Sequence, residues 1–244
     1  MSLEALIFDV DGTLAETEEA HRTAFNATFE AWGLCWHWTQ ADYRELLKTT
    51  GGKERIRAFQ KTLPGGARRL SDEEVALFHA EKTAAYTDIL ARGELELRRG
   101  VADLIAAAKR AGLRVAVATT TNLPNVEALT QCCWGQPAKE VFEVIAAGDE
   151  VEAKKPAPDV FELALTRLGI PPDRGLAFED SRNGVLSAKG AGLEVVVTPS
   201  AYTDADDFSA ADYVVPSLEP AHWPVRLREA IADVVESAQG QRVG

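Results

Sequence analysis

Short apolar runs that alternate with helical stretches constrain the fold of this 244-residue chain more than any other feature. These runs are too short for helices and suit strands buried on both faces of a parallel sheet, at 5–8, 115–118, 144–146, 176–178 and 195–197. Helical patterns are expected between them, at 101–112, 122–133, 157–169 and 182–191. This alternation predicts an α/β fold with helices on both faces of the sheet.

The segment from residue 16 to residue 92 breaks the alternation, because it has helical patterns and no convincing strand. One pattern begins with Ser71 and Glu74, which have the spacing of a capping box. We therefore predict a Rossmann-like core domain from residues 1–15 and 93–244, and a helical cap domain, residues 16–92, inserted after the first strand. A cap above the carboxyl edge of a parallel sheet would act as a lid, since ligands bind at that edge.

Composition excludes several classes of function. The 38 acidic residues outnumber the 26 basic ones, a balance that argues against binding to nucleic acid, which requires a basic face. No window approaches 18 uncharged apolar residues, and the N-terminal residues do not resemble a secretory leader. Three cysteines without a CxxC spacing do not suggest a zinc site. We expect a cytoplasmic, monomeric protein with no membrane or nucleic-acid partner.

The strongest chemical signal is the pair Asp9 and Asp11, directly after the first predicted strand. Two carboxylates spaced in this way converge once the chain turns, and Gly12 permits the turn. A calcium loop also starts with such a pair but requires a Glu at its twelfth position, where this chain has Ala20. An ordinary polar turn is the remaining alternative for the motif taken alone.

Further polar side chains follow later predicted strands. Thr119 comes after 115–118, Glu179 and Asp180 come after 176–178, and Lys155 precedes a helix. Each has an ordinary structural alternative, as a helix cap or a solvated lysine. Together with the first acid pair, however, they all fall on one edge of one sheet, and this coincidence predicts a site.

These motifs resemble those of the haloacid dehalogenase superfamily of phosphotransferases, as DVDGTL, the threonine of AVATT, KKPAPD and FEDS. The resemblance covers nearly the whole chain, including the helical cap. The chain is most similar to the subgroup related to β-phosphoglucomutase, and within it DGTLAETEEAH, TTGGKER, ATTTN and EDSRNG resemble the CbbY-type phosphatases. Those phosphatases are associated with xylulose 1,5-bisphosphate.

The resemblance implies a role for each motif residue. Asp9 is expected to be the nucleophile that forms an aspartyl phosphate, and Asp11 the general acid and base. Thr119 and Lys155 would bind the phosphoryl oxygens. The expected cofactor is Mg²⁺, with ligands from Asp9, Asp11 (through its backbone carbonyl), Asp180 and, directly or through another group, Glu179.

Substrate contacts are expected from the cap and from the loop after the second motif. By position, Glu16 and His21 are able to bind sugar hydroxyls. Helix-start amides suit an anion at Thr120, Thr121 and Asn122. In the cap, the resemblance suggests that Lys53, in the turn that contains Gly52, and Lys82 bind the phosphate that is not transferred; a solvated helix lysine is the alternative for Lys82.

The sequence therefore predicts a Mg²⁺-dependent phosphatase for a small phosphorylated sugar, with xylulose 1,5-bisphosphate the best single substrate. A sugar-phosphate mutase and a phosphoglycolate-type phosphatase are alternatives, because the same motifs serve all three. A non-catalytic sensor of phosphorylated metabolites is disfavoured, since no motif residue is missing.

Overall fold

The computed structural model describes residues 2–93 and 95–240, so residues 241–244 of the predicted core segment lie outside the described part of the chain. Its centre is a six-stranded parallel sheet in the order β3-β2-β1-β4-β5-β6. The strands are β1 (Ala5–Phe8), β2 (Arg114–Ala118), β3 (Val144–Ala146), β4 (Gly175–Glu179), β5 (Glu194–Val197) and β6 (Tyr213–Val214). The predicted α/β class and five of the strands are confirmed; β6 was not predicted.

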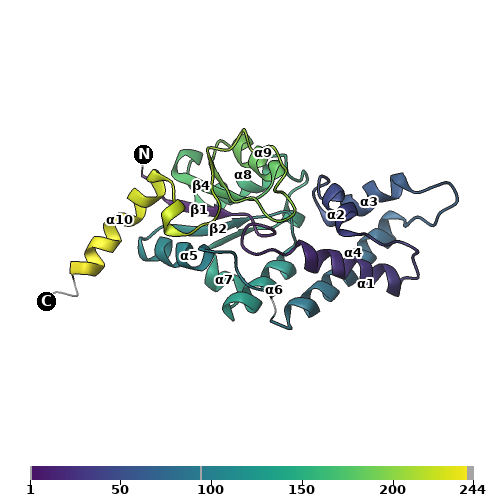
Figure 1. Ribbon diagram of the computed structural model, residues 1–244. Coiled ribbons are helices and arrows are strands. Elements are labelled where there is room, and N and C mark those ends of the chain that lie inside the picture. The colour runs from purple at the N-terminus through teal and green to yellow at the C-terminus, as the bar shows by residue number, and fades with distance from the viewer. Residues whose placement is uncertain (1, 94, 241–244) are drawn as a thin grey trace.

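Helices cover both faces of this sheet (Figure 1). Those of the sheet-containing part are α5 (Val101–Arg110), α6 (Leu123–Trp134), α7 (Ala138–Val141), α8 (Asp159–Leu168), α9 (Arg182–Gly190) and α10 (Val225–Gly240). Short 3₁₀ turns occur at Gly148–Glu150, Pro172–Arg174 and Pro220–His222. No helix in the described ranges is both long enough and apolar enough to cross a membrane.

Alternation along the strands explains the two layers. In β1, Leu6 and Phe8 belong to the hydrophobic cluster that includes residues of α5, α6 and α7, whereas Ala5 and Ile7 belong to the cluster that includes residues of α8 and α9. Because successive side chains of a strand point to opposite faces, a run that is apolar at every position is buried on both sides.

Between β1 and β2 the chain forms four helices, α1 (Glu18–Ala31), α2 (Gln40–Leu46), α3 (Gly52–Thr62) and α4 (Asp72–Leu90). They lie beyond one end of the sheet (Figure 1) and have their own hydrophobic cluster, which contains Trp36 and Trp38. Ser71 and Glu74 form the predicted capping box at the start of α4. The helical cap after the first strand is therefore present.

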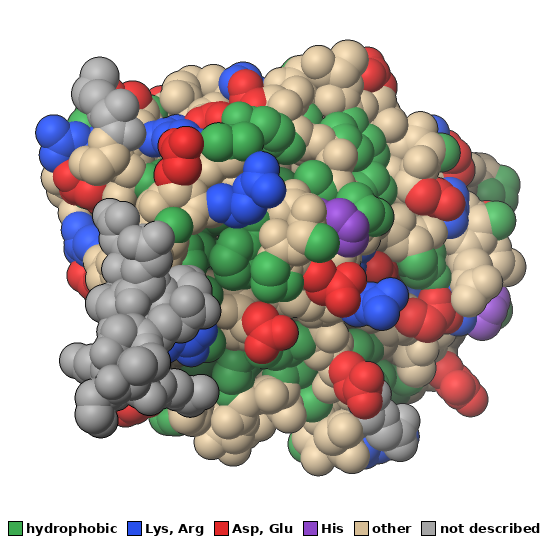
Figure 2. Space-filling view, turned by 60° about the vertical axis from the view of Figure 1, so that its left-hand side comes forward, with side chains coloured by type: hydrophobic (Ala, Val, Ile, Leu, Met, Phe, Trp, Pro, Cys, Tyr) green, Lys and Arg blue, Asp and Glu red, His purple; other side chains and the backbone are tan. Residues whose placement is uncertain are grey.

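Two chain crossings connect these helices to the sheet. Ala15 on the way out and Leu97 on the way back form an antiparallel bridge, and the Arg98 amide donates to the Leu14 carbonyl at 2.8 Å. On the face seen in Figure 2, acidic and basic side chains of the described residues are interspersed.

Candidate active site

Strand register brings the predicted motif residues to one edge of the sheet. Phe8 of β1 is level with Val117 of β2 and with Phe178 of β4, so the residues that follow these three strand positions are also level. Asp9 leaves β1 at this point with its amide donating to the Phe178 carbonyl at 2.9 Å, and Glu179 is the last residue of β4. The predicted convergence of the first and last acidic motifs follows from this register.

Lys155 joins the two acidic motifs. Its Nζ lies 2.6 Å from Asp9 Oδ1 and 2.6 Å from Glu179 Oε1, and all three side chains are buried. Burial alone would lower the pKa of Lys155, but the charges of Asp9 and Glu179 outweigh it and raise that pKa. Burial, only partly offset by Lys155, raises the pKa values of Asp9 and Glu179. A single ammonium group thus holds two desolvated carboxylates together.

A buried acidic cluster suits a divalent cation. Carboxylate oxygens of Asp9, Glu179 and Asp180 all lie within 4.8 Å of one another. Burial and the nearby Asp9 raise the pKa of Asp180 to about 7, because three carboxylates share this space with one ammonium group. Oxygen ligands of this kind are those that Mg²⁺ prefers, and a cation would relieve the repulsion. These residues therefore fit the expected metal.

Asp11 is not part of this cluster and has other hydrogen-bond partners. Its Oδ1 accepts a hydrogen bond from Thr17 Oγ1 at 2.6 Å and lies 3.0 Å from His21 Nε2, while Lys82 Nζ lies 2.6 Å from His21 Nδ1. Burial opposes the charged form of Asp11, but His21 and the hydrogen bonds from His21 and Thr17 outweigh it and lower the pKa of Asp11 to about 2. The side chain of Asp11 thus has its partners in Thr17 and His21 and not in the acidic cluster.

His21 is the centre of this chain of contacts. Burial, followed by the neighbouring charge of Lys82, lowers the pKa of His21 to about 4. In a neutral His21 ring, Nδ1 accepts a hydrogen bond from Lys82, so Nε2 carries the proton and donates to Asp11. Burial lowers the pKa of Lys82 to about 7, and its ammonium group lies over the rings of Phe25 and Tyr86. Lys82 is therefore buried in the site and is not a solvated helix lysine.

A cavity of about 700 Å³ lies between the cap helices and the sheet edge. Most of the predicted site residues line it, namely Asp9, Asp11, His21, Gly52, Lys53, Lys82, Thr120, Thr121, Asn122, Lys155 and Asp180. Thr119 and Glu179 are fully buried beside it and do not line it. The cavity is large enough for a drug-sized or smaller molecule.

The loop after β2 is held by its own side chains. The Thr121 amide donates to Thr119 Oγ1 at 3.2 Å, and Asn122 caps α6 by accepting from the Asn125 amide. Asn122 Nδ2 also donates to Thr83 Oγ1 of α4 at 3.2 Å. These bonds give the loop a defined shape and tie it to the cap.

Glu16 lies in a different place from the other predicted substrate contacts. It is outside the set of residues that line the cavity, and its carboxylate forms an ion pair with Arg98 at 3.2 Å and accepts from the Ala201 amide at 3.2 Å. Both carboxylate oxygens thus have partners within the protein.

Several residues of the cavity were not predicted from the sequence. Glu18 is 5% exposed, its Oε2 has no hydrogen-bond partner, and burial together with Asp180 and Asp11 raises its pKa well above the usual range. His79 lies three residues before Lys82 on α4, a spacing that places both on one face and would have revealed it. No local signal marks Tyr43, which accepts from Arg55 at 3.0 Å.

Polar contacts join the cap to the sheet-containing part across the cavity. Asn183 Nδ2 donates to Thr50 Oγ1 at 3.0 Å and to the Lys48 carbonyl at 3.1 Å. On the other side Lys53 Nζ lies 3.5 Å from Asp149 Oδ1. The cavity is therefore bounded on two sides by contacts between the two parts.

An acidic cluster at the carboxyl edge of a parallel sheet, beneath an inserted helical cap, is typical of enzymes of the α/β class. A sequence profile of haloacid dehalogenase-like hydrolases matches residues 3–192, and the chain belongs to that family. Protein CbbY of Rhodobacter capsulatus is 58% identical over 221 residues, which make up 91% of this chain and 96% of that protein.

Solved structures agree with this assignment. CbbY from Rhodobacter sphaeroides in complex with phosphate is 54% identical, with a TM-score of 0.88 over 92% of this chain and 99% of that one. A mutant of the same protein in complex with xylulose 1,5-bisphosphate is 53% identical, with the same TM-score and coverage. β-Phosphoglucomutase from Clostridium difficile is 19% identical, with a TM-score of 0.75 over 96% of this chain and 99% of that one, a likeness of fold alone.

Proposed function

We propose that this protein is a Mg²⁺-dependent phosphatase that hydrolyses xylulose 1,5-bisphosphate through an aspartyl phosphate on Asp9. The observation that carries the proposal is the buried group of Asp9, Lys155, Glu179 and Asp180 at the wall of a cavity that also contains cationic side chains of the cap. The likeness to a CbbY that was solved with this sugar bisphosphate supports the choice of substrate.

In the first proposed step, a carboxylate oxygen of Asp9 attacks the phosphorus atom, and the bond from phosphorus to the sugar oxygen breaks. Asp11 gives its proton to that leaving oxygen. An entering anion raises the pKa of a nearby carboxylate, and the contacts from Lys82 through His21 supply a route by which Asp11 is protonated. Asp11 thus begins the step as an acid.

In the second step, water attacks the phosphorus atom and breaks its bond to Asp9. Asp11, now a carboxylate, takes the proton of this water, and inorganic phosphate leaves. Thr119 and Lys155 are proposed to bind the phosphoryl oxygens throughout. Lys155 has a second task, since it also holds Glu179 next to Asp9.

Mg²⁺ would be held by Asp9, Asp180 and the backbone carbonyl of Asp11, with Glu179 beside them, and it would offset the negative charge of the phosphoryl group. Glu179 is already bonded to Lys155, which suits a supporting place beside the cation. The cluster has more negative charge than Lys155 alone balances, so a cation is expected to bind there, and its charge would favour an anionic substrate.

The second phosphate of the substrate is proposed to lie toward the cap. Lys53 at the start of α3 is its first candidate ligand, and Lys82 faces the same cavity from α4. Thr120, Thr121 and Asn122 would contact the sugar between the two phosphates. Two cationic side chains of the cap facing one cavity favour a substrate with a second phosphate.

We further propose the division into a core of residues 1–15 and 93–244 and a cap of residues 16–92, with the cap closing over the substrate. The separate hydrophobic cluster of the cap and the bridge between Ala15 and Leu97 at the two crossings support it. The protein is also proposed to be a cytoplasmic monomer, and its three unpaired cysteines suit the cytoplasm.

The test is release of inorganic phosphate with Mg²⁺ from a panel containing xylulose 1,5-bisphosphate, ribulose 1,5-bisphosphate and β-glucose 1-phosphate. The proposal predicts multiple turnovers with a strong preference for the xylulose compound, and no release by Asp9→Asn. Equal, slow release from every compound would reject the substrate. Conversion of a sugar phosphate to its isomer without free phosphate would instead identify a mutase.

A further inference from the structure

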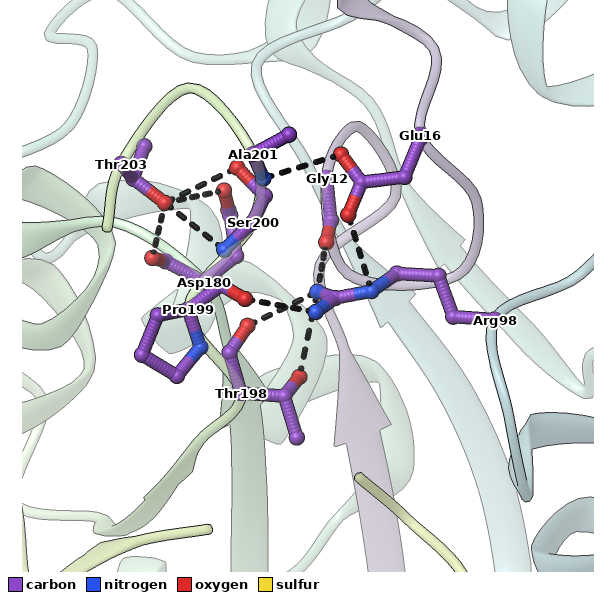
Figure 3. Close-up of polar contacts among 9 residues, drawn as sticks. All are labelled: Gly12, Glu16, Arg98, Asp180, Thr198, Pro199, Ser200, Ala201 and Thr203. Atoms are coloured by element: carbon purple, nitrogen blue, oxygen red, sulfur yellow. Dashed lines mark hydrogen bonds and ion pairs between the residues drawn. The ribbon is translucent and has the colours of Figure 1, made fainter. Parts of the chain in front are cut away.

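Arg98 connects three separate segments beside the acidic cluster (Figure 3). It lies just after the bridge residue Leu97, and its side chain is 15% exposed. Its guanidinium group donates to the carbonyl of Gly12, to the carbonyl of Thr198 at 2.7 Å and to the carbonyl of Pro199 at 2.6 Å. The loop after β1 and the loop after β5 are therefore bound to one planar group.

Glu16 fixes the opposite side of this guanidinium group. Its Oε1 lies 3.2 Å from Arg98 Nε, and its Oε2 accepts from the Ala201 amide at 3.2 Å. Glu16 belongs to the outgoing crossing and Arg98 to the returning one, so both crossings contact the same loop after β5. A closed network of this kind permits few orientations of the arginine fork.

The loop after β5 in turn holds Asp180. Thr203 Oγ1 lies 2.7 Å from the backbone oxygen of Asp180 and 3.1 Å from its Oδ2. Ser200 Oγ lies 2.9 Å from the same Thr203 hydroxyl, and all three residues are buried. The position of the Asp180 carboxylate therefore depends on the loop that Arg98 binds at Thr198 and Pro199.

The loop after β1 approaches the same carboxylate. A Cβ atom on Gly12 would lie 2.3 Å from Asp180 Oδ2, so the two segments are in close contact at this point. Gly12 directly follows Asp11, whose carbonyl is a proposed cation ligand. Arg98, bound to the Gly12 carbonyl on one side and to the loop after β5 on the other, thus spans both halves of the cation site.

We propose that Arg98 is a positioning residue that sets the distance between Asp180 and the loop of Asp9 and Asp11, and thereby the affinity for the divalent cation. This inference rests on the proposed function only for the identity of the cation. The task requires the planar fork and not merely a positive charge, because the fork alone reaches several carbonyls in fixed directions. A lysine in its place would donate from a single nitrogen.

The test compares Arg98→Lys and Arg98→Met with the wild-type chain by direct cation binding, using Mn²⁺ followed by electron paramagnetic resonance and Mg²⁺ followed by calorimetry. We expect both variants to bind at least tenfold more weakly. The matched control is Arg226→Lys, since Arg226 forms an ion pair with Glu194 at the opposite end of β5. This control is expected to bind both cations as the wild type does.

The same two variants distinguish an effect of the planar shape of the Arg98 guanidinium group from an effect of its charge. If Arg98 acted through its charge alone, Arg98→Lys would keep its affinity, and Arg98→Met, which removes a positive charge next to the acidic cluster, would bind the cation more tightly. Either result would overturn the proposal, as would a fall in melting temperature with unchanged cation affinity of the folded protein.

Should both Arg98 variants fail to fold, Glu16→Gln tests the same network, because it weakens the anchor of Arg98 Nε and keeps the size of the side chain. A loss of cation affinity of about threefold or more is expected, and an unchanged affinity would contradict the proposal. Cation binding needs no substrate, so these outcomes are independent of whether any sugar phosphate is hydrolysed.

Discussion

Lys155 is the residue on which the proposed chemistry depends most, because it is the ammonium group shared by Asp9 and Glu179. Lys155→Ala should slow turnover by a factor of about 10² to 10³, the usual effect of removing one group that stabilises charge in a transition state. It also leaves two buried carboxylates without a partner, at a cost of about 3–5 kcal/mol of stability. Turnover is therefore measured at a temperature where circular dichroism shows the variant folded.

Lys189→Ala is the matched control for this experiment. Lys189 forms an ion pair with Asp212 at 2.9 Å on the surface, outside the cavity lining. Near-normal turnover is expected of this control. Near-normal turnover of Lys155→Ala, in contrast, would show that its assigned role is wrong.

His79 allows a prediction about pH. Burial, then the charges of Lys82 and Lys53, lower the pKa of His79 to about 3 from an ordinary value of 6.5. Between pH 3 and pH 6.5, His79 binds a proton in the unfolded chain but not in the folded one. The contribution of the neutral His79 to the free energy of unfolding is therefore complete above pH 6.5 and is lost as the pH falls toward 3. From pH 7 to pH 5 it should fall by about 2 kcal/mol.

The measurement is the free energy of urea unfolding of the wild type and of His79→Gln at both pH values. The wild type should lose about 2 kcal/mol more than the variant on acidification, because glutamine does not titrate. Comparing the two chains cancels the carboxylates of the site, which titrate in both. Parallel losses in the two chains would contradict a half-buried His79 that stays neutral in the folded chain.

At the scale of elements, the turn after β1 is where the backbone itself shapes the site. Gly12 has φ +81°, and a Cβ there would meet Asp180 Oδ2 at 2.3 Å and Glu18 Oε1 at 2.8 Å. Gly33 has φ +62° with no atom within 4 Å of such a Cβ. Alanine at either position costs about 1–2 kcal/mol for the left-handed backbone.

Gly12→Ala should therefore lower stability by more than Gly33→Ala and, unlike it, should weaken Mg²⁺ binding by displacing Asp180. Calorimetric titration of the folded variants with Mg²⁺ checks the second effect, and thermal unfolding checks the first. Equal stability losses with unchanged cation affinity in both variants would show that the close approach of Gly12 and Asp180 has no functional consequence.

Much of the fold was predictable at this scale because its signals are local. Short apolar runs identified β1 to β5, and glycine at the helix ends, such as Gly169, marked where helices finish. β6 has only the two residues Tyr213 and Val214, and Val214 is 54% exposed, so it lacks the apolar run that identifies a buried strand.

From strand patterns alone, the site was predictable where polar residues follow a strand. Asp9, Thr119 and Asp180 could be placed because each comes directly after a recognisable strand. The partners of Glu16 could not be predicted, because Arg98 and Ala201 are far away in sequence and no periodicity connects them to Glu16. Hydrogen bonds between distant loops leave no local pattern, and the position of Glu16 outside the cavity lining depends on them.

At the scale of the whole molecule, we expect the contacts across the cavity to favour the closed cap. Asn183→Ala removes two hydrogen bonds from the core to the cap, to Thr50 and to the Lys48 carbonyl. The loss should cost the closed state about 1 kcal/mol net and therefore raise KM for the sugar phosphate about fivefold. Steady-state kinetics measure the change, with small-angle scattering to detect a more extended chain.

Asn26→Ala is the control for cap closure. Asn26 also makes two hydrogen bonds to backbone, both to Trp38 within the cap, so its loss affects stability without touching the contacts across the cavity. KM should stay near the wild-type value. An equal rise of KM in both variants would mean that Asn183 acts through general stability and not through closure.

The proposed mechanism depends most on the transfer of the phosphoryl group to Asp9 as an aspartyl phosphate. The most direct measurement is rapid acid quenching of the enzyme mixed with Mg²⁺ and xylulose 1,5-bisphosphate, at times from milliseconds to seconds, followed by mass spectrometry of the peptide that contains Asp9. We expect a phosphorylated Asp9 that forms before phosphate is released and decays with turnover, and no label in Asp9→Asn. Release of phosphate by the Asp9→Asn variant at the wild-type rate, or a label on another residue, would contradict the proposed mechanism.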